Sequence, residues 1–166
     1  MKKSVYILAS VALLGLAACG QEAAKPVEQP SAPAQTAPEA LPALETANAQ
    51  QFVPEGGSLV PLELDSAGNI TVTGTVTGYV APVYAVAVAQ GQTLSVDFKT
   101  DSTNLYVNIS DAADHSGAAL HRGEVEGAKA TLTAPRNMTF VIIPYQPRAT
   151  ARRNETGDFS LTVSRS

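Results

Sequence analysis

The feature that most constrains the fold of this chain is a period-two alternation of apolar and polar residues. At residues 70–76 and 94–99, apolar side chains alternate with threonine, serine or charged ones. Such alternation is typical of a β-strand with one buried and one solvated face. Similar short runs lie at residues 84–88, 105–109, 130–132, 140–143 and 159–163, with weaker candidates at 59–64 and 118–120.

Turn-forming residues separate these runs, for example at 67–69, 90–92 and 134–137. No stretch of useful length repeats its apolar residues at the helical period. Seven to nine short strands predict an all-β fold, an antiparallel β-sandwich, with a small barrel as the alternative. The sequence holds one cysteine and no tryptophan, so no internal disulfide can form. We therefore expect a core built largely from valine, leucine, isoleucine and alanine.

The N-terminal residues have the pattern of an exported protein. Two lysines precede an apolar run at residues 5–18, which is shorter than the roughly 20 residues that a membrane-spanning helix needs. The Leu-Ala-Ala-Cys sequence that ends at Cys19 resembles the lipobox of bacterial lipoproteins. The resemblance implies that residues 1–18 are a signal peptide and that acylated Cys19 anchors the protein in a membrane. Gly20 stands where many inner-membrane lipoproteins carry aspartate, so we expect the periplasmic face of the outer membrane in a Gram-negative cell.

Residues 19–51 differ from the rest of the chain in composition. Alanine, glutamine and glutamate predominate, and prolines interrupt the stretch at positions 26, 30, 33, 38 and 42. A segment with few apolar residues and many prolines buries too little surface to offset the entropy cost of ordering. We expect a disordered linker there, with a packed N-terminal arm as the alternative. The remaining residues, 52–166, have a normal size for one domain.

The charges of the chain are unevenly distributed. Without the predicted signal peptide, there are nine basic and fifteen acidic side chains, and this excess of acid argues against a nucleic-acid partner. Five of the six arginines lie in the last 31 residues, and Arg148, Arg152 and Arg153 share one predicted loop. These arginines either pair with nearby carboxylates such as Glu155 and Asp158, which contributes little to stability, or recognise an anion. Composition alone does not decide whether these arginines form surface ion pairs or recognise an anion.

No arrangement of residues indicates an enzyme. His115 and His121 do not have a recognised zinc spacing, and no Gly-x-Ser-x-Gly motif marks a serine nucleophile. Asp111, Asp114 and His115 could in principle hold a metal. However, their segment lacks the alternating oxygen ligands of a calcium loop and is better explained as a polar surface turn. We therefore expect a non-enzymatic protein with neither a cofactor nor a metal site.

The C-terminal segment at residues 148–163 resembles the closing segment of the periplasmic inhibitors of goose-type (g-type) lysozyme. That family shows an Arg-x-x-Ala-Arg-Arg-x-Glu-Thr loop, followed by a strand with an aromatic-x-Leu-x-Val pattern, and both patterns occur here. The likeness spans about residues 70–163. Further matches lie upstream, at residues 72–78, 84, 89–96 and 105–108.

The resemblance implies a proteinaceous inhibitor of lysozyme, with the g-type enzyme as its first expected partner. It implies that the three arginines of the loop enter the substrate cleft, where a glycosidase carries its catalytic carboxylate. Tyr79 and Tyr145 are expected as aromatic companions of the loop, and Glu155 is expected to brace it by pairing with one arginine. The lipid anchor would hold this inhibitor at the membrane.

Two prolines, Pro144 and Pro147, depart from the family's pattern, as do the lipid anchor and the long linker. The alternative function is a non-inhibitory β-sandwich module that binds peptidoglycan, a glycan or a protein of the cell envelope. Fold alone does not separate these functions, because sandwiches support many of them. The sequence does not predict the oligomeric state.

Overall fold

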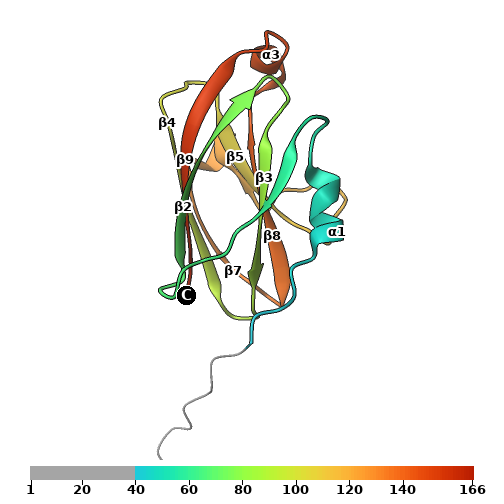
Figure 1. Ribbon diagram of the computed structural model, residues 1–166, viewed down its shortest axis with the longest axis vertical. Helices are drawn as coiled ribbons and strands as arrows, with labels where there is room; N and C mark the ends of the chain where they lie inside the picture. The colour runs from blue at the N-terminus through green and yellow to red at the C-terminus, as the bar shows by residue number, and fades with distance from the viewer. Residues whose placement is uncertain (1–39) are drawn as a thin grey trace, which may run out of the picture. The chain divides into compact units, whose positions relative to one another are not determined.

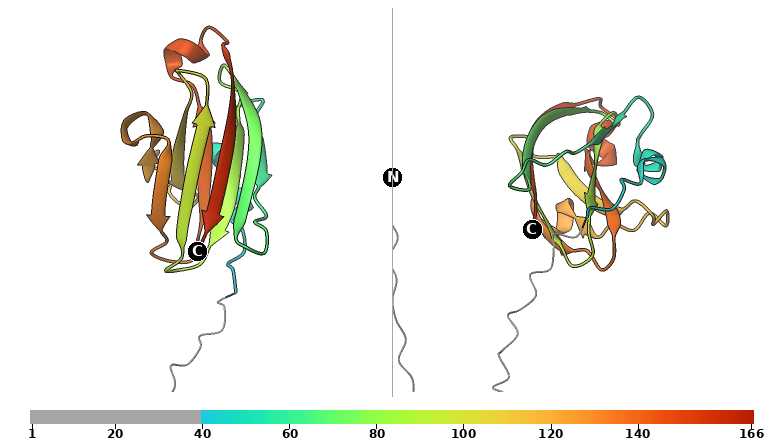
Figure 2. Two further views of the ribbon diagram at one scale, coloured as in Figure 1. Left: turned by 90° about the vertical axis from the view of Figure 1, so that its left-hand side faces the viewer. Right: turned by 60° about the horizontal axis from the view of Figure 1, so that its bottom comes forward.

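A computed structural model describes residues 40–166, and the fold of this part confirms the predicted β-sandwich (Figures 1 and 2). Within it, a five-stranded sheet has the order β1-β3-β8-β5-β6, and a four-stranded sheet has the order β2-β9-β4-β7. The strands are β1 (Ser58–Pro61), β2 (Asn69–Thr77), β3 (Pro82–Val88), β4 (Thr93–Thr100), β5 (Tyr106–Asp111), β6 (His121–Arg122), β7 (Lys129–Thr133), β8 (Met138–Tyr145) and β9 (Thr156–Arg165).

Neighbouring strands pair in antiparallel fashion, except β1 and β3, which run parallel. β9 lies between β2 and β4, and its register with β2 runs from Asn69↔Ser164 to Thr77↔Thr156. β8 lies between β3 and β5 in the other sheet. The last two long strands of the chain are therefore central, and the connection between them crosses from one sheet to the other.

The period-two pattern of the sequence matches burial in the four-stranded sheet. Leu94, Val96 and Phe98 of β4 are buried, while the residues between them are partly exposed. Successive side chains of a strand point to opposite faces, so one apolar face is enough. β8 differs, because its residues from Met138 to Ile142 are all buried. A strand without alternation indicates a sheet that is covered on both faces.

The main core lies between the two sheets. Phe159 of β9 stacks on Phe98 of β4 with ring centroids 5.2 Å apart, and it meets Tyr84 of β3 edge-on at 6.2 Å. Full burial of a large aliphatic or aromatic side chain contributes about 1.5–3 kcal/mol, so such a core supports the domain without a disulfide. Its largest fully buried side chains are Phe140, Leu94, Ile109, Ile142 and Leu161.

A second apolar cluster covers the outer face of the five-stranded sheet. Two short helical turns, α1 (Thr46–Ala49) and η1 (Gln50–Phe52), lie against this face (Figure 1). Ala49 is fully buried there, and Leu44 and Phe52 pack against the same cluster. The cluster explains why alternation is lost in β8.

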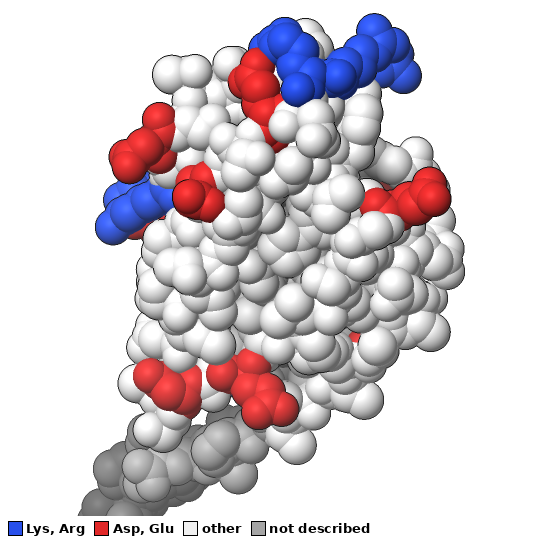
Figure 3. All heavy atoms as spheres, turned by 45° about the horizontal axis from the view of Figure 1, so that its top comes forward, with Lys and Arg blue, Asp and Glu red and all other residues white. Residues whose placement is uncertain are grey.

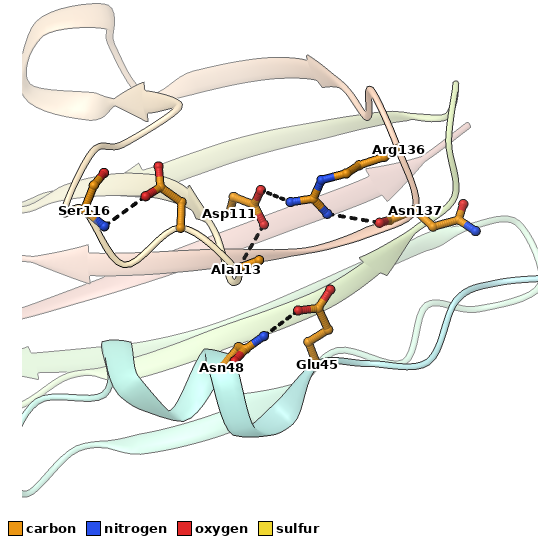
Figure 4. A network of polar contacts seen from close by, with 8 residues as sticks. Glu45, Asn48, Asp111, Ala113, Ser116, Arg136 and Asn137 are labelled. Atoms are coloured by element: carbon orange, nitrogen blue, oxygen red, sulfur yellow. Dashed lines mark hydrogen bonds and ion pairs between the residues drawn. The ribbon is translucent and has the colours of Figure 1, made fainter.

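Polar contacts tie this N-terminal arm to the sandwich. The Glu45 N–H donates to Thr139 Oγ1 at 2.9 Å. Asn48 Nδ2 donates to Glu45 Oε2 at 2.6 Å (Figure 4). The sequence predicts a linker up to residue 51, but residues 44–51 pack on the sheet. The alternative of a packed arm describes these residues. The earlier part of the predicted linker, the signal peptide and Cys19 lie outside the described residues.

Two of the weaker expectations have different outcomes. The strand expected within residues 59–64 is present as β1, whereas the strand expected at 118–120 is wrong, because β6 begins only at His121. The helices α2 (Gly123–Glu126) and α3 (Arg148–Ala151) each have four residues, too few to produce a helical period in the sequence. Within residues 40–166, no helix is both long and apolar enough to span a membrane.

The connections between strands gather at two ends of the sandwich (Figure 1). At one end, here called the α3 end, the β2–β3 turn touches the β8–β9 connection through the Gly78 N–H, which donates to Glu155 O at 2.9 Å. At the opposite end, the β3–β4 turn meets the β7–β8 turn. There the Gly91 N–H donates to Ala134 O at 2.8 Å.

Candidate functional site

The connection between β8 and β9 is a compact turn, here called the α3 loop (residues 147–155). The Pro147 carbonyl accepts hydrogen bonds from the N–H groups of Thr150 and Ala151, both at 2.9 Å. The Asn154 N–H donates to Ala151 O at 3.0 Å, and Asn154 has a φ of 55°, which asparagine tolerates better than most residues. The loop is therefore closed by its own backbone.

Burial divides the α3 loop into an inner and an outer side. Thr150 and Ala151 are buried against the sandwich, whereas Arg148, Arg152 and Arg153 are exposed. Basic side chains accordingly gather at the α3 end in Figure 3. The inner residues are small, so the loop sits close to the sheets and directs three guanidinium groups outward.

The β2–β3 turn braces the α3 loop from one side. Gly78 has a φ of +59°, and a Cβ built there would lie 2.7 Å from Asn154 Oδ1 and 3.1 Å from Ala151 O. Only glycine combines this backbone conformation with so close an approach. Tyr79 follows directly, and 56% of its surface is exposed. This contact brings Tyr79 to the same end as the three arginines.

The three arginines differ in their partners. Arg153 Nε donates to Glu155 Oε1 at 2.5 Å, and both side chains are exposed. No carboxylate within residues 40–166 lies within 4.0 Å of the guanidinium groups of Arg148 and Arg152. An exposed pair such as Arg153–Glu155 contributes at most about 1 kcal/mol. The α3 loop thus presents one paired arginine and two with no carboxylate partner among the described residues.

Tyr145 is the last residue of β8 and is partly buried. Its hydroxyl donates to Glu124 Oε2 at 3.4 Å, and its ring lies 6.1 Å from the ring of Tyr106. Burial raises the pKa of Tyr145, and the nearby Glu124 carboxylate raises it further. Tyr145 therefore stays neutral over the physiological pH range and presents an aromatic face with a hydroxyl rather than a charge.

Tyr79 and Tyr145 line a common recess of about 320 Å³ at the α3 end. Gln146 lines the same recess, and no sequence motif marks this residue as functional. Its side chain is 6% exposed, and neither amide atom has a hydrogen-bond partner among the described residues. The one unusual local feature is its position between Pro144 and Pro147, directly after an apolar strand.

The acidic residues considered as metal ligands have structural roles instead (Figure 4). Asp111 Oδ1 accepts from the Ala113 N–H at 3.0 Å, and the Asp111 carboxylate pairs with Arg136. Asp114 Oδ1 accepts from the Ser116 N–H at 2.9 Å, and hydrogen bonds from Ser116 lower the pKa of Asp114. Both contacts are typical of turns that an aspartate side chain closes. Over residues 40–166, no group of three or more His, Cys, Asp or Glu side chains is placed to hold a metal ion.

All six residues of the predicted surface lie at the α3 end. Arg148, Arg152, Arg153 and Glu155 belong to the α3 loop, Tyr79 to the bracing turn, and Tyr145 to the end of β8. The structure places the two tyrosines at the recess rather than on the loop itself. Whether these residues contact a partner stays a prediction.

No family model and no curated protein matches the chain. Three solved structures of PliG, each a periplasmic lysozyme inhibitor of g-type lysozyme, are similar to it. The protein from Aeromonas hydrophila is 28% identical, with a TM-score of 0.60 over 66% of this chain and 97% of that one. The protein from Salmonella Typhimurium is 19% identical, with a TM-score of 0.52 over 66% and 99% of the two chains. A mutant of the Escherichia coli protein is 16% identical, with a TM-score of 0.53 over 67% and 99%.

These similarities show first of all that the chain has the same fold as the PliG proteins. The Salmonella and Escherichia coli proteins, at 19% and 16% identity, share the fold alone. The Aeromonas protein adds a distant likeness in sequence over nearly its whole length. The resemblance predicted from the sequence is therefore confirmed as a structural similarity to PliG inhibitors.

Proposed function

We propose that this protein inhibits g-type lysozyme and that its α3 loop enters the substrate cleft of the enzyme. The observation that carries the proposal is the presentation of Arg148 and Arg152. Both are exposed, and neither has an ion pair within residues 40–166. The loop that holds them is braced by the Gly78 turn on a sandwich similar in fold to PliG. The distant sequence likeness to the Aeromonas inhibitor supports the choice of enzyme class.

The chemistry of the cleft suits a guanidinium group. Glycosidases act through carboxylic acid side chains that flank the scissile bond. Arginine offers a planar fork of N–H donors that can grip a carboxylate at two points, and such charge-assisted bonds are stronger than neutral ones. A hydrogen bond to a charged group contributes about 1.5–3 kcal/mol. A loop that is already ordered loses little entropy on binding, which favours affinity.

We further propose that acylated Cys19 tethers the inhibitor to the periplasmic face of the outer membrane. The support is the sequence pattern at residues 1–20, because these residues lie outside the described part of the chain. Radiolabelled palmitate should be incorporated into the protein and lost with Cys19→Ser. Cell fractionation should then move the variant from the membrane to the soluble fraction.

The inhibitory function is tested by a muramidase assay. The mature chain with Cys19→Ser would be titrated against a g-type lysozyme, alongside a variant that adds Arg148→Ala and Arg152→Ala. The matched control adds Lys129→Ala and Arg136→Ala, which remove the same charge outside the α3 loop. We expect the arginine variant to lose at least a hundredfold in affinity and the control to inhibit normally.

Each other outcome has a definite meaning. Equal inhibition by both variants would support the proposed function but would place the binding surface outside the α3 loop. A lack of inhibition by the unsubstituted chain would contradict the proposed function. Retention on purified peptidoglycan, unaffected by the arginine substitutions, would then favour the non-inhibitory envelope module.

A further inference from the structure

The edge strands of the two sheets differ in how well they are protected against pairing with another chain. Short length, proline and lysine are common means of protection. β6 has two residues, β1 has four and contains Pro61, and β7 has five and contains Lys129. β2, at one margin of the four-stranded sheet, has nine residues with neither a charged side chain nor a proline (Figure 2). Among residues 40–166, β2 is therefore the one long edge strand without these features.

The register of β2 with β9 shows which backbone groups face the free edge. The Gly68 carbonyl accepts from the Arg165 N–H, and the Gly78 N–H donates to Glu155 O, both at 2.9 Å. Hydrogen-bonded pairs alternate along an antiparallel ladder, so the even-numbered residues of β2 bond to β9. The odd-numbered residues therefore direct their N–H and C=O groups away from β9.

The chain itself satisfies both ends of this row of backbone groups. The Asp65 N–H donates to Asn69 O at 2.9 Å, and the Asn69 N–H donates to Asp65 Oδ1 at 2.8 Å. At the other end, Thr77 and Val80 exchange two backbone hydrogen bonds, at 3.0 and 2.9 Å. Between these ends, three alternate residues form no backbone hydrogen bond on the free side within residues 40–166, namely Thr71, Thr73 and Thr75. The unpaired stretch is thus symmetric about its middle residue.

This stretch of β2 is complementary to itself. A second copy, turned by a twofold rotation at Thr73, would place Thr71 of one chain opposite Thr75 of the other. The two Thr73 residues would then lie opposite each other. All of these are positions whose N–H and C=O groups face the free edge, so each unpaired group of the stretch would find a partner.

The side chains on the outer face of the sheet suit the same arrangement. Thr71 Oγ1 lies 3.0 Å from Thr162 Oγ1 of β9, and Thr77 Oγ1 lies 3.1 Å from Thr156 Oγ1. Threonine opposite threonine is a stabilising pair between neighbouring strands. Because the unpaired stretch carries an exposed threonine at each alternate position, two copies would repeat these pairs. No charged side chain of β2 would oppose its own copy.

We propose that this protein forms a symmetric dimer in which the β2 strands of two copies pair in antiparallel fashion. The two four-stranded sheets would then become one continuous sheet. Antiparallel pairing points the two α3 ends in opposite directions, so neither α3 loop is covered. The proposal goes beyond lysozyme inhibition, because the pairing edge contains no residue of the α3 loop. An interface of one strand pair is small, so we expect a weak dimer.

The first test measures association of the mature chain with Cys19→Ser by sedimentation equilibrium, from micromolar to millimolar concentration. Thr73→Lys would oppose two lysines at the twofold axis. The matched control, Thr131→Lys, adds the same charge to an exposed position on β7, at the other margin of the same sheet. We expect the dissociation constant of the dimer to rise at least tenfold in Thr73→Lys and to stay the same in the control.

The second test leaves the sequence of β2 unchanged, so a folding defect of the lysine variant would not affect it. Amide hydrogen exchange at Thr71, Thr73 and Thr75 should slow as the concentration of the chain with Cys19→Ser rises. The amide of Thr131 should exchange at a constant rate. The three threonine amides report the proposed hydrogen bonds directly, whereas a dimer formed through another surface would leave them unprotected.

A third test uses the absence of other cysteines in the chain with Cys19→Ser. Directly opposed residues of a hydrogen-bonded antiparallel pair have Cα atoms about 5.5 Å apart, which a disulfide can span. Thr73→Cys should therefore form a disulfide-linked dimer under mild oxidation. Thr131→Cys, equally exposed on β7, should form far less of it.

Three results would overturn the proposal. The first is sedimentation of the unsubstituted β2 chain as a monomer at millimolar concentration. The second is an equal effect of Thr73→Lys and Thr131→Lys on association. The third is protection of the three threonine amides that does not change with concentration, which would assign the edge to another segment of the same chain.

Discussion

The two ends of the sandwich differ in how they use their polar groups. At the opposite end, Arg136 pairs with Asp111, the Gln90 N–H donates to Asn137 Oδ1 at 2.8 Å, and Arg165 Nη1 donates to Ala87 O at 2.7 Å. At the α3 end, two arginines have no carboxylate partner among the described residues, and the Gln146 amide is unpaired within the same part of the chain.

The two ends of the sandwich therefore contribute to different properties of the protein, namely stability and recognition. An end whose donors and acceptors satisfy one another closes the sandwich and adds to its stability. An end that presents exposed arginines without carboxylate partners gains little stability from them and is suited to recognition. Substitutions at the two ends should therefore change different measured quantities.

The largest expected effect is the destabilisation of the domain by Gly78→Ala, and Gly91→Ala at the opposite end is its control. Gly78→Ala would force a Cβ to within 2.7 Å of Asn154 Oδ1 at a positive φ, whereas Gly91, with a φ of +81°, has no atom within 4 Å of such a Cβ. The conformation alone costs about 1–2 kcal/mol, and the overlap adds about 1–3 kcal/mol at Gly78. Urea unfolding should show the greater loss for Gly78→Ala, and equal losses would argue against the brace.

The next effect concerns the three arginines of the α3 loop. Arg148→Ala and Arg152→Ala should each weaken lysozyme inhibition about 10- to 100-fold, because each removes a charged hydrogen-bond donor. Arg153→Ala should have a smaller effect, since its guanidinium is already paired with Glu155. Inhibition constants measured for the three single variants test this order, and a dominant role of Arg153 would reverse it.

A smaller effect is expected at the opposite end. Arg136→Ala should lower the free energy of unfolding by about 1 kcal/mol, because Asp111 is only 16% exposed and loses its ion pair. Lysozyme inhibition should not change. Arg148→Ala, with the same loss of charge, should alter stability by less than about 0.5 kcal/mol. Arg136→Ala should therefore change stability without changing inhibition, and Arg148→Ala should change inhibition with little change in stability.

The smallest expected effect is a change in the free energy of unfolding at alkaline pH, caused by the titration of Tyr145. Burial, and then Glu124, raise the pKa of Tyr145 above its ordinary value of 10.0, so the folded state holds this proton more tightly than the unfolded state. The stabilisation is complete below pH 10 and is lost as the pH rises through the folded-state pKa. Unfolding free energies measured above pH 10 should fall less steeply in Tyr145→Phe. An unchanged slope would mean that Tyr145 titrates normally.

Sequence reasoning located the strands because alternation is a local signal. The pattern at residues 70–76 and 94–99 was sufficient for β2 and β4, since each has one buried face. The sequence favours a linker over the alternative of a packed N-terminal arm because Leu44 is an isolated apolar residue in a proline-rich context. Its burial depends on an outer sheet face that is visible only in three dimensions.

The candidate site was predictable only in part, for a similar reason. The clustering of Arg148, Arg152 and Arg153 is visible in the sequence, whereas their different pairing is not. The role of Gly78 depends on contact with Asn154, a residue 76 positions later in the chain. The recess that Gln146 lines is formed by three segments that are far apart in the sequence. Such long-range contacts have no local pattern.

The point where the N-terminal arm meets the sandwich lies at the end opposite to the α3 loop. Glu45 is bonded to Thr139 near the start of β8, whereas α3 follows the end of that strand. The arm therefore meets the sandwich far from α3 (Figure 1). The proposed anchor and the proposed binding of an enzyme would therefore make use of opposite ends of the described domain.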